Sequence, residues 1–102
     1  MNTIIESFTF TKKVSRLWSE KEQSAFFTFI ANNPLAGNVI PGTGGVRKVR
    51  WGKQGSGKRG GTRIVYYNKS ENEIWLLMIY AKNEIEDMSA ADLRKLRVDI
   101  DD

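Results

Sequence analysis

The side chains in this sequence with the most obvious chemistry are lysine and arginine, and they are concentrated in one segment. Between Gln23 and Ser70 there is no Asp or Glu, whereas eight basic residues lie there: Arg47, Lys48, Arg50, Lys53, Lys58, Arg59, Arg63 and Lys69. The whole chain carries +4, so this segment at +8 is offset by −4 elsewhere. Such a one-signed field concentrates polyanions and steers their arrival. We therefore expect a nucleic acid as the partner.

Histidine and cysteine are both absent, which removes several kinds of catalytic site. Zinc sites built from these residues are excluded, as are Ser-His and Cys-His nucleophiles and paired-histidine nucleases. The acidic residues lie away from the basic segment, so we do not expect a magnesium ion held by carboxylates. Any catalysis must use Lys, Arg, Tyr, Ser or carboxylates, and we expect neither a metal nor a cofactor.

The length of 102 residues is enough for one domain with a modest core, and we expect a single domain over residues 1–102. Without cysteine there is no disulfide framework, so a reducing cytosol is the default compartment. The longest apolar run, Ile74 to Tyr80, is too short to span a bilayer, and residues 1–10 do not resemble a signal peptide. A soluble cytoplasmic protein with no membrane partner is expected.

The N-terminal third predicts a strand followed by a helical hairpin. Ile4 to Phe10 alternates imperfectly between apolar and polar residues, which indicates a short strand, and Thr11 to Trp18 then changes to helical spacing. Ser19 and Glu22 have the spacing of a capping box at the start of a second helix. Residues 32–34, Asn-Asn-Pro, are expected to end it.

The middle of the chain predicts an antiparallel meander after a loop over residues 34–45. Its strands are expected at Val46 to Trp51, Thr62 to Tyr67 and Ile74 to Tyr80. The connection from Gly52 to Gly61 contains five glycines in ten residues together with three bases. Such a segment is too flexible to pack in a core, and we expect a mobile basic flap.

The C-terminal part predicts a short helix. Ser89 and Asp92 can cap it, and Leu93 and Leu96 follow before an acidic tail, residues 99–102, for which disorder is the simplest expectation. The expected fold class is therefore α+β, with N-terminal helices packed on a small, mainly antiparallel sheet and a short C-terminal helix.

Alternation along the predicted strands sorts the charged residues onto faces. Lys48 and Arg50 share a face opposite Val49 and Trp51, and Arg63 shares a face with Val65 and Tyr67. In the last strand the same rule groups a further set: Ile74, Leu76, Met78, Tyr80 and Lys82. If adjacent strands pair in order, the set Lys48, Arg50, Arg63 and Lys82 converges on one rim of the sheet beneath the flap. That arrangement makes a pocket of the size of a phosphate.

Three segments in this region carry a resemblance to a known family: GTGGVRKVR at 42–50, GKRGGTRIVYY at 57–67 and LLMIYAKNE at 76–84. In this order they resemble RelE/HigB-type toxins of bacterial type II toxin–antitoxin systems, in the RelE/ParE superfamily, over roughly residues 35 to 92. The resemblance implies a RelE-like toxin fold and cleavage of messenger RNA in the ribosomal A site. It also implies neutralisation by a cognate antitoxin, which in the HigB branch usually has a helix-turn-helix domain.

The resemblance also assigns roles to the bases. It places Lys48, Arg50 and Arg63 at the family's catalytic positions and matches Lys82 to the basic position after the last core strand. Lys58 and Arg59 belong to the family's loop, and with Arg47 and Lys53 they complete the expected RNA-binding set. Some relatives have a tyrosine a few residues after that last base, where this sequence has Ser89. The general acid is therefore unassigned.

These residues suit metal-independent cleavage of RNA by its own 2′-hydroxyl. Fixed cations can align the phosphodiester and stabilise charge on five-coordinate phosphorus. A lysine among other cations is a candidate base, so Lys48 or Lys82 could substitute for the missing histidine. Tyr66, Tyr67 and Tyr80 could stack on unpaired bases, although a place in the core or on the sheet is the commoner use of strand tyrosines.

Two other functions stay open at this point. A ParE-like relative would poison DNA gyrase and leave transcripts uncut, and a non-catalytic RNA- or ribosome-binding module would bind in a salt-dependent way without toxicity. The basic residues favour the endoribonuclease, because a gyrase poison has no need of cations aimed at a phosphate. The same charge favours an antitoxin with an acidic binding segment.

Overall fold

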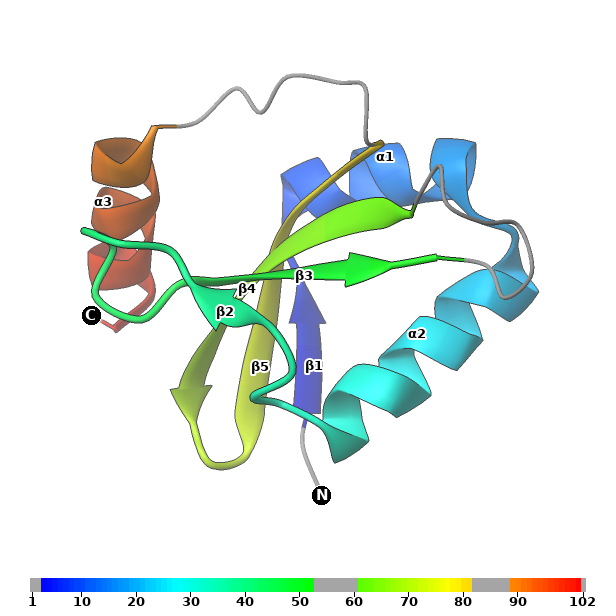
Figure 1. Cartoon of the computed structure of the whole chain (residues 1–102), viewed down its shortest axis with the longest axis horizontal. Helices are drawn as coiled ribbons and strands as arrows, with labels where there is room; N and C mark the ends of the chain where they lie inside the picture. The colour runs from blue at the N-terminus through cyan, green and yellow to red at the C-terminus, as the bar shows by residue number, and fades with distance from the viewer. Residues whose placement is uncertain (1–2, 53–60, 82–88, 102) are drawn as a thin grey trace.

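The structure, a computed structural model, describes residues 3–52, 61–81 and 89–101 (Figure 1). The described helices and strands, in chain order, are β1 Thr3–Glu6, α1 Phe8–Leu17, α2 Glu20–Asn32, β2 Asn38–Val39, β3 Arg47–Trp51, β4 Thr62–Ser70, β5 Glu73–Ala81 and α3 Ala90–Asp101. The predicted α+β class is confirmed, with two N-terminal helices, a mostly antiparallel sheet and a C-terminal helix. Among the described residues, none of the helices has the length and apolar content needed to cross a bilayer.

The sheet has five strands in the order β1-β5-β4-β3-β2. Strands β3, β4 and β5 form the predicted antiparallel meander. β1 pairs with β5 in parallel, and the two-residue β2 pairs with β3 at the opposite edge. β2 lies inside the segment expected to be loop, where the sequence gives too short a run to indicate a strand.

The first helix begins earlier than its sequence pattern indicates, so the prediction of a strand through Phe10 is wrong. The side chain of Ser7 accepts a hydrogen bond of 3.0 Å from the backbone N–H of Phe10 and thereby caps α1. The Ser7 hydroxyl also donates to the carbonyl of Leu77 in β5, at 2.8 Å. Phe8 and Phe10 mimic strand alternation, but only Phe10 is buried, whereas Phe8 is 78% exposed.

The second helix has the predicted limits. The Ser19 hydroxyl accepts from the backbone N–H of Glu22, and the Glu22 carboxylate accepts from the backbone N–H of Ser19. This reciprocal pair is the capping box expected from the sequence. The helix ends at Asn32, directly before the Asn-Pro pair.

Two apolar layers hold the sheet between helices. One lies between the sheet and the N-terminal helices: Phe10, Val14, Trp18, Phe26, Ile30, Val49, Ile64, Tyr66, Ile74, Leu76 and Ile79. The other lies on the face covered by α3: Val46, Val65, Leu77, Met78, Tyr80 and Leu93. We call these sides of the sheet the α1/α2 face and the α3 face.

A β-bulge in β5 changes which side chains share a face. Val65 pairs with Met78 but the next residue of β4, Tyr66, pairs with Leu76, so Leu77 is an extra residue in β5. Ile74 and Leu76 therefore point to the α1/α2 face, whereas Met78 and Tyr80 point to the α3 face. The prediction that these four residues share a face is wrong, because strict alternation does not survive the inserted residue.

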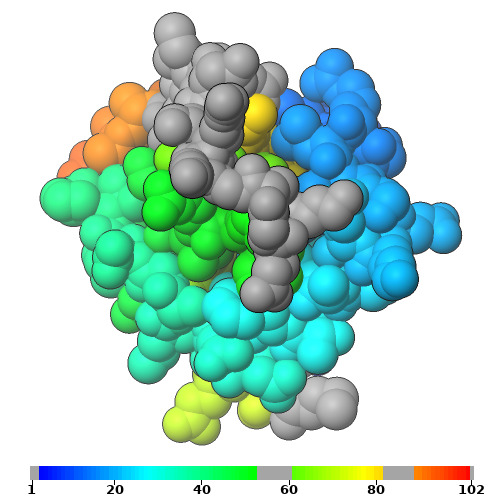
Figure 2. Space-filling view, turned by 45° about the vertical axis from the view of Figure 1, so that its right-hand side comes forward, coloured from blue at the N-terminus to red at the C-terminus, as the bar shows by residue number. Residues whose placement is uncertain are grey.

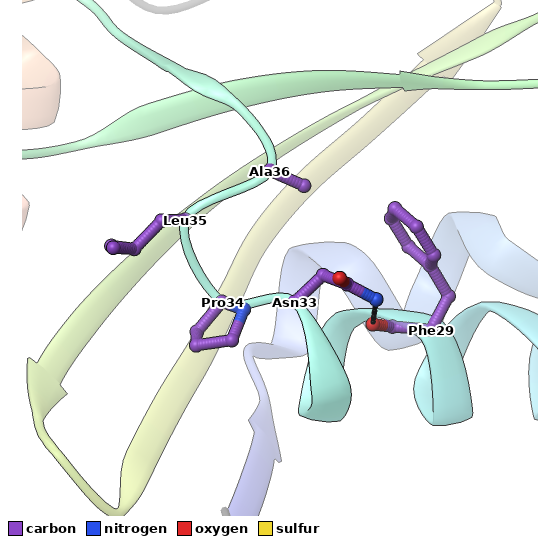
Figure 3. Close-up of a pocket in the computed structure, with 5 residues that line it drawn as sticks. All are labelled: Phe29, Asn33, Pro34, Leu35 and Ala36. Atoms are coloured by element: carbon purple, nitrogen blue, oxygen red, sulfur yellow. Dashed lines mark hydrogen bonds between the residues drawn. The ribbon is translucent and has the colours of Figure 1, made fainter.

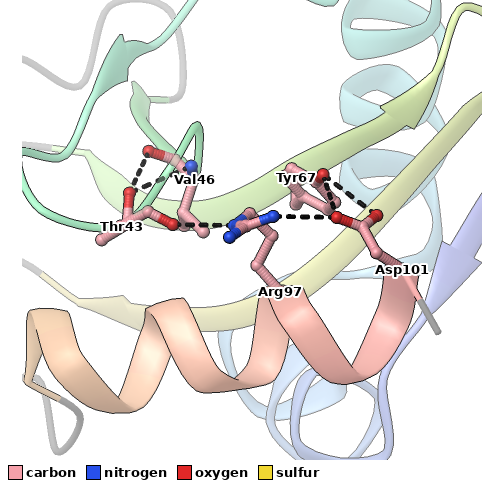
Figure 4. Close-up of polar contacts among 5 residues, drawn as sticks. All are labelled: Thr43, Val46, Tyr67, Arg97 and Asp101. Carbon is pink, nitrogen blue, oxygen red and sulfur yellow. Dashed lines mark hydrogen bonds and ion pairs between the residues drawn. The ribbon is translucent and has the colours of Figure 1, made fainter.

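The C-terminal helix starts where the sequence predicts and extends further. At its first turn the Ser89 hydroxyl accepts from the backbone N–H of Asp92 at 3.2 Å, and the Asp92 carboxylate accepts from the backbone N–H of Ser89 at 3.3 Å. The helix runs through Asp101, so the expected disorder of the tail is wrong for residues 99–101. Tyr67 on β4 donates to the Asp101 carboxylate at 2.9 Å and 3.1 Å to its two oxygens, and Arg97 forms an ion pair with it at 2.9 Å (Figure 4).

Arg97 also ties the helix to the loop before β3. Its Nε donates to the carbonyl of Thr43 at 3.0 Å (Figure 4). Thr43 is itself fully buried, and its hydroxyl donates to the carbonyl of Ile40 and accepts from the N–H of Val46. The loop directly before β3 is therefore held both by α3, through Arg97, and by the Thr43 hydroxyl within the loop. The basic residues of β3 follow directly after it.

Candidate phosphate-binding site

Strand register brings three of the predicted catalytic residues together. Arg50 on β3 pairs directly with Arg63 on β4, and Lys48 lies two residues before Arg50 on the same face of β3. Residues opposite each other in a sheet have Cβ atoms about 4.5–5.5 Å apart, and alternate residues of a strand are about 6.6 Å apart. One phosphate group is therefore within reach of more than one of these cations. In the space-filling view the green surface of β3 lies between α3 in orange and α1 in blue (Figure 2).

This set is on the α3 face, and Lys48 and Arg50 share one side of β3, as alternation predicts. Lys48 and Arg50 are exposed, while Val49 between them is buried on the α1/α2 face. Arg63 is half-buried on the α3 face, and Tyr80 of β5, only 7% exposed, pairs with it.

The two arginines form an electrostatically unfavourable pair. Like charges placed directly opposite in a sheet are destabilising. Within residues 3–52, 61–81 and 89–101, neither Lys48 nor Arg50 forms an ion pair or hydrogen bond through its side chain. Arg63 donates from Nη1 to the carbonyl of Gly61 at 3.0 Å. Locally unfavourable arrangements of this kind are typical of functional sites, and their cost is offset elsewhere in the protein.

Arg47 does not lie with these residues, although it is their neighbour in sequence. It points to the α1/α2 face, where its Nη1 donates to the carbonyls of Gly37 at 2.6 Å and Leu35 at 3.5 Å. Its guanidinium thus holds the loop that follows α2. Its expected contact with RNA stays a prediction.

The remaining predicted bases are outside the described residues. Lys82 of the catalytic set and Lys53, Lys58 and Arg59 of the RNA-binding set are among them, as is most of the expected flap. In the described part of the chain there is no group of three or more acidic residues placed to hold a metal ion.

Two neighbouring tyrosines of β4 have structural partners. The Tyr66 hydroxyl is completely buried, donates to the carbonyl of Pro34 at 2.8 Å and accepts from the N–H of Gly37 at 3.0 Å. Burial raises the pKa of Tyr66 above its usual 10.0, against the opposing effects of the Gly37 N–H and Arg47. Burial, together with the Asp101 carboxylate, also raises the pKa of Tyr67. Neither phenol is therefore a base near neutral pH, and Tyr66 has no surface for stacking.

Two of the tryptophans, Trp18 and Trp51, act in packing. Trp18 is 6% exposed and its indole N–H donates to Thr62 at the start of β4, at 3.2 Å. Trp51 packs on Phe29 with ring centroids 4.6 Å apart, at the end of β3 next to Arg50. These contacts fix the end of β3 and the start of β4. Arg50 and Arg63 are the next residue pair along these two strands.

An apolar pocket lies at the end of α2. It has a volume of about 350 Å³ and is lined by Phe29, Asn33, Pro34, Leu35 and Ala36 (Figure 3). The Asn33 amide is used within the chain, because it donates to the carbonyl of Phe29 at 3.0 Å. The lining holds no titratable side chain, so this pocket offers no acid, base or phosphate ligand.

Gly61 is the residue of this region that sequence reasoning did not single out. It comes directly before β4, and its contacts with Arg63 and Arg50 join the two arginines. In the sequence Gly61 is one of five glycines in the connection, and flexibility explains all five equally well. Nothing in that pattern distinguishes Gly61 from the others.

A comparison with protein-family models finds a match along most of the chain. The family is described as "RelE toxin of RelE / RelB toxin-antitoxin system", and it matches residues 10–99. The matched range runs from within α1 to within α3 and contains every predicted site residue.

Proposed function

Because this chain belongs to the RelE toxin family and is the toxin of a toxin–antitoxin system, we propose that it is a ribosome-dependent endoribonuclease. It cleaves messenger RNA in the A site and thereby inhibits translation. One observation supports this most directly: Arg50 faces Arg63 across two strands, with Lys48 on the same exposed face and no described carboxylate neutralising Lys48 or Arg50.

The proposed chemistry is attack by the 2′-hydroxyl on the adjacent phosphorus. The new O2′–P bond forms as the P–O5′ bond breaks, which leaves a 2′,3′-cyclic phosphate and a free 5′-hydroxyl. Arg50 and Arg63 bind the non-bridging oxygens, where the paired N–H groups of a guanidinium match the geometry of phosphate. Their charge stabilises the dianionic transition state.

Proton transfer is assigned to the lysines of the predicted catalytic set. Lys48 accepts the 2′-hydroxyl proton, since it is the amine on the same face as the arginines. Lys82 is the proposed donor of the proton that the leaving O5′ takes up, because the family resemblance matches it to the basic position after the last core strand. The reaction uses no metal and no cofactor.

The ribosome supplies what a small toxin lacks. Three cations on an open sheet can grip a phosphodiester but cannot by themselves hold the RNA in line for attack, which is a large part of the barrier to this reaction. The ribosomal A site fixes the messenger, and the +8 segment steers the toxin to it. Neutralisation falls to a cognate antitoxin, for which we propose a helix-turn-helix domain and an acidic toxin-binding segment.

The test is cleavage of a messenger on purified, programmed ribosomes under single-turnover conditions, with 5′ ends mapped. Arg50→Ala and Arg63→Ala are each expected to slow cleavage by about 10²–10³-fold, as for loss of one donor to a transition-state oxyanion. Lys48→Ala is expected to slow it and to alter its pH dependence. Lys69→Ala is the matched control, because it removes the same charge from the same segment at the far, exposed end of β4.

The outcome also separates the alternatives. If all three variants cleave as the wild type does while folded, the cations do not act on the scissile phosphate and the proposal fails. DNA damage with intact transcripts would instead indicate a gyrase poison. Salt-dependent RNA binding without cleavage or toxicity would indicate a binding module.

A further inference from the structure

Gly61 contacts both arginines of the proposed site. Its carbonyl accepts the hydrogen bond from Nη1 of Arg63 at 3.0 Å. A Cβ atom at this position would lie 2.8 Å from Cγ and 3.4 Å from Cδ of Arg50, and 3.2 Å from the carbonyl oxygen of Trp51. The aliphatic part of Arg50 therefore lies directly across the bare Cα of Gly61.

The backbone conformation of Gly61 requires a glycine for a second reason. Its φ is +80°, in the region that residues with a side chain rarely adopt. This conformation aims the carbonyl at Arg63 while the Cα supports Arg50. One residue without a side chain thus sets the direction of one guanidinium and the path of the other.

Support from Gly61 limits the movement of two arginine side chains that repel each other. Two guanidinium groups on opposite strands repel each other, and a long arginine side chain has many rotamers to leave the pair. Productive alignment of a reacting phosphate tolerates little displacement, and about 1 Å can cost about 10²-fold in rate. A fixed support for both side chains preorganises the grip before RNA arrives.

We propose that Gly61 is a positioning residue that holds Arg50 and Arg63 in register for one phosphodiester. This inference rests on the proposed function for its substrate, but it concerns a residue to which that function assigns no role. Gly61 touches no reacting atom and acts only through the two arginines.

The chain offers a matched control for the key variant. Gly42 also has φ +80°, but among the described residues a Cβ there would meet only the Cβ of Ala90, at 3.9 Å, which is an ordinary contact. Gly61→Ala and Gly42→Ala therefore share the strain of a positive φ, and only the first brings a methyl group against Arg50 and the Trp51 carbonyl. Because asparagine tolerates positive φ better than alanine, Gly61→Asn with Gly42→Asn provides a second pair should Gly61→Ala fail to fold.

The first measurement is single-turnover cleavage on programmed ribosomes, with folding checked by urea unfolding. Gly61→Ala is expected to lower the maximal rate by about 10–100-fold, whereas Gly42→Ala stays within about 2-fold of the wild type. In an Arg50→Ala background, which removes the Cγ and Cδ that the new methyl would strike, Gly61→Ala is expected to cost less than in the wild type, because only its effects through Arg63 and the Trp51 carbonyl remain. Additive losses in this cycle would overturn the inference, because a merely structural effect does not depend on Arg50.

The second measurement keeps this inference distinct from the proposed function. The affinity for a single-stranded 2′-O-methyl oligoribonucleotide, which lacks the attacking hydroxyl, is measured at several salt concentrations. If the wild type binds but never cleaves, the endoribonuclease proposal fails, yet weaker binding by Gly61→Ala than by Gly42→Ala would still support positioning. Equal behaviour of the two glycine variants in both measurements overturns the inference, as does a wild type that neither binds nor cleaves RNA.

Discussion

Removal of a single buried oxygen by Tyr66→Phe is expected to lower the free energy of unfolding by about 1–3 kcal/mol. The Tyr66 hydroxyl joins the carbonyl of Pro34 to the N–H of Gly37, and the side chain is completely buried. The Pro34 carbonyl keeps a second donor, since the Asn68 amide lies 3.0 Å from it. The N–H of Gly37 loses its acceptor, and an unsatisfied buried donor accounts for most of the expected loss.

The adjacent tyrosine is the control. Tyr67→Phe removes a hydroxyl that bonds to Asp101 at the exposed end of α3, so its expected cost is below about 1 kcal/mol. Both variants are compared with the wild type by urea unfolding and by thermal unfolding. Each kcal/mol corresponds to a shift of about 4–8 °C in Tm for a domain of this size. Faster hydrogen exchange at the Gly37 amide is expected in Tyr66→Phe alone.

The raised pKa of Tyr66 predicts that the free energy of unfolding depends on pH. Because burial raises the pKa of Tyr66 above 10.0, the folded phenol keeps its proton at a pH where the unfolded phenol loses it. The unfolded state then binds fewer protons, so stability falls as pH rises above about 10 and is fully retained below it. The stability difference between wild type and Tyr66→Phe is expected to shrink in that range. A Tyr66→Phe variant no less stable than Tyr67→Phe, with Gly37 exchange unchanged, would refute the reasoning.

Three further substitutions test the elements that position the site. Ser19→Ala removes one half of the capping box of α2 and is expected to cost about 1 kcal/mol in urea unfolding, without changing cleavage of RNA. Leu93→Ala empties the centre of the α3 face, where this residue is 1% exposed, and is expected to cost about 2–5 kcal/mol; a loss under 1 kcal/mol would mean that α3 is not packed there. Asp101→Asn weakens the contacts to Arg97 and Tyr67 and is expected to lower stability by less than about 1 kcal/mol, with a smaller effect at high salt, seen as a Tm difference that narrows with added NaCl.

The parts of the fold that were predictable depend on local signals. The capping box at Ser19, the limits of α2 and the three strands of the meander follow from patterns within a few residues of each other. Alternation also placed Lys48 and Arg50 on one face of β3, because this strand is regular over its whole length. The structure then needed only the expected strand pairing to bring Arg63 opposite Arg50.

The errors occur where a distant contact decides a local conformation. Ser7 caps α1 while its hydroxyl reaches Leu77 across the sheet, so the residues after it form a helix rather than the alternating strand that their pattern resembles. The extra residue in β5, Leu77, has no sequence signal, because every residue near it is apolar on either face. Likewise, the acidic end of α3 is ordered by two contacts of Asp101. One is with Tyr67, which is distant in the sequence, and the other is with Arg97, one helical turn earlier.

The sequence by itself determined the charge of the partner and the candidate chemistry. A segment with eight bases and no acid attracts a polyanion in any fold, and a chain without histidine or cysteine must act on phosphate through lysine and arginine. Only the tertiary structure decided which bases act together. Arg47 and Lys48 are neighbours in the chain but lie on opposite faces of β3, whereas Arg50 and Arg63 are separated by the whole glycine-rich connection and face each other. Strand pairing and the pleat set that geometry, because they fix the directions of side chains whose positions in the sequence say nothing about distance.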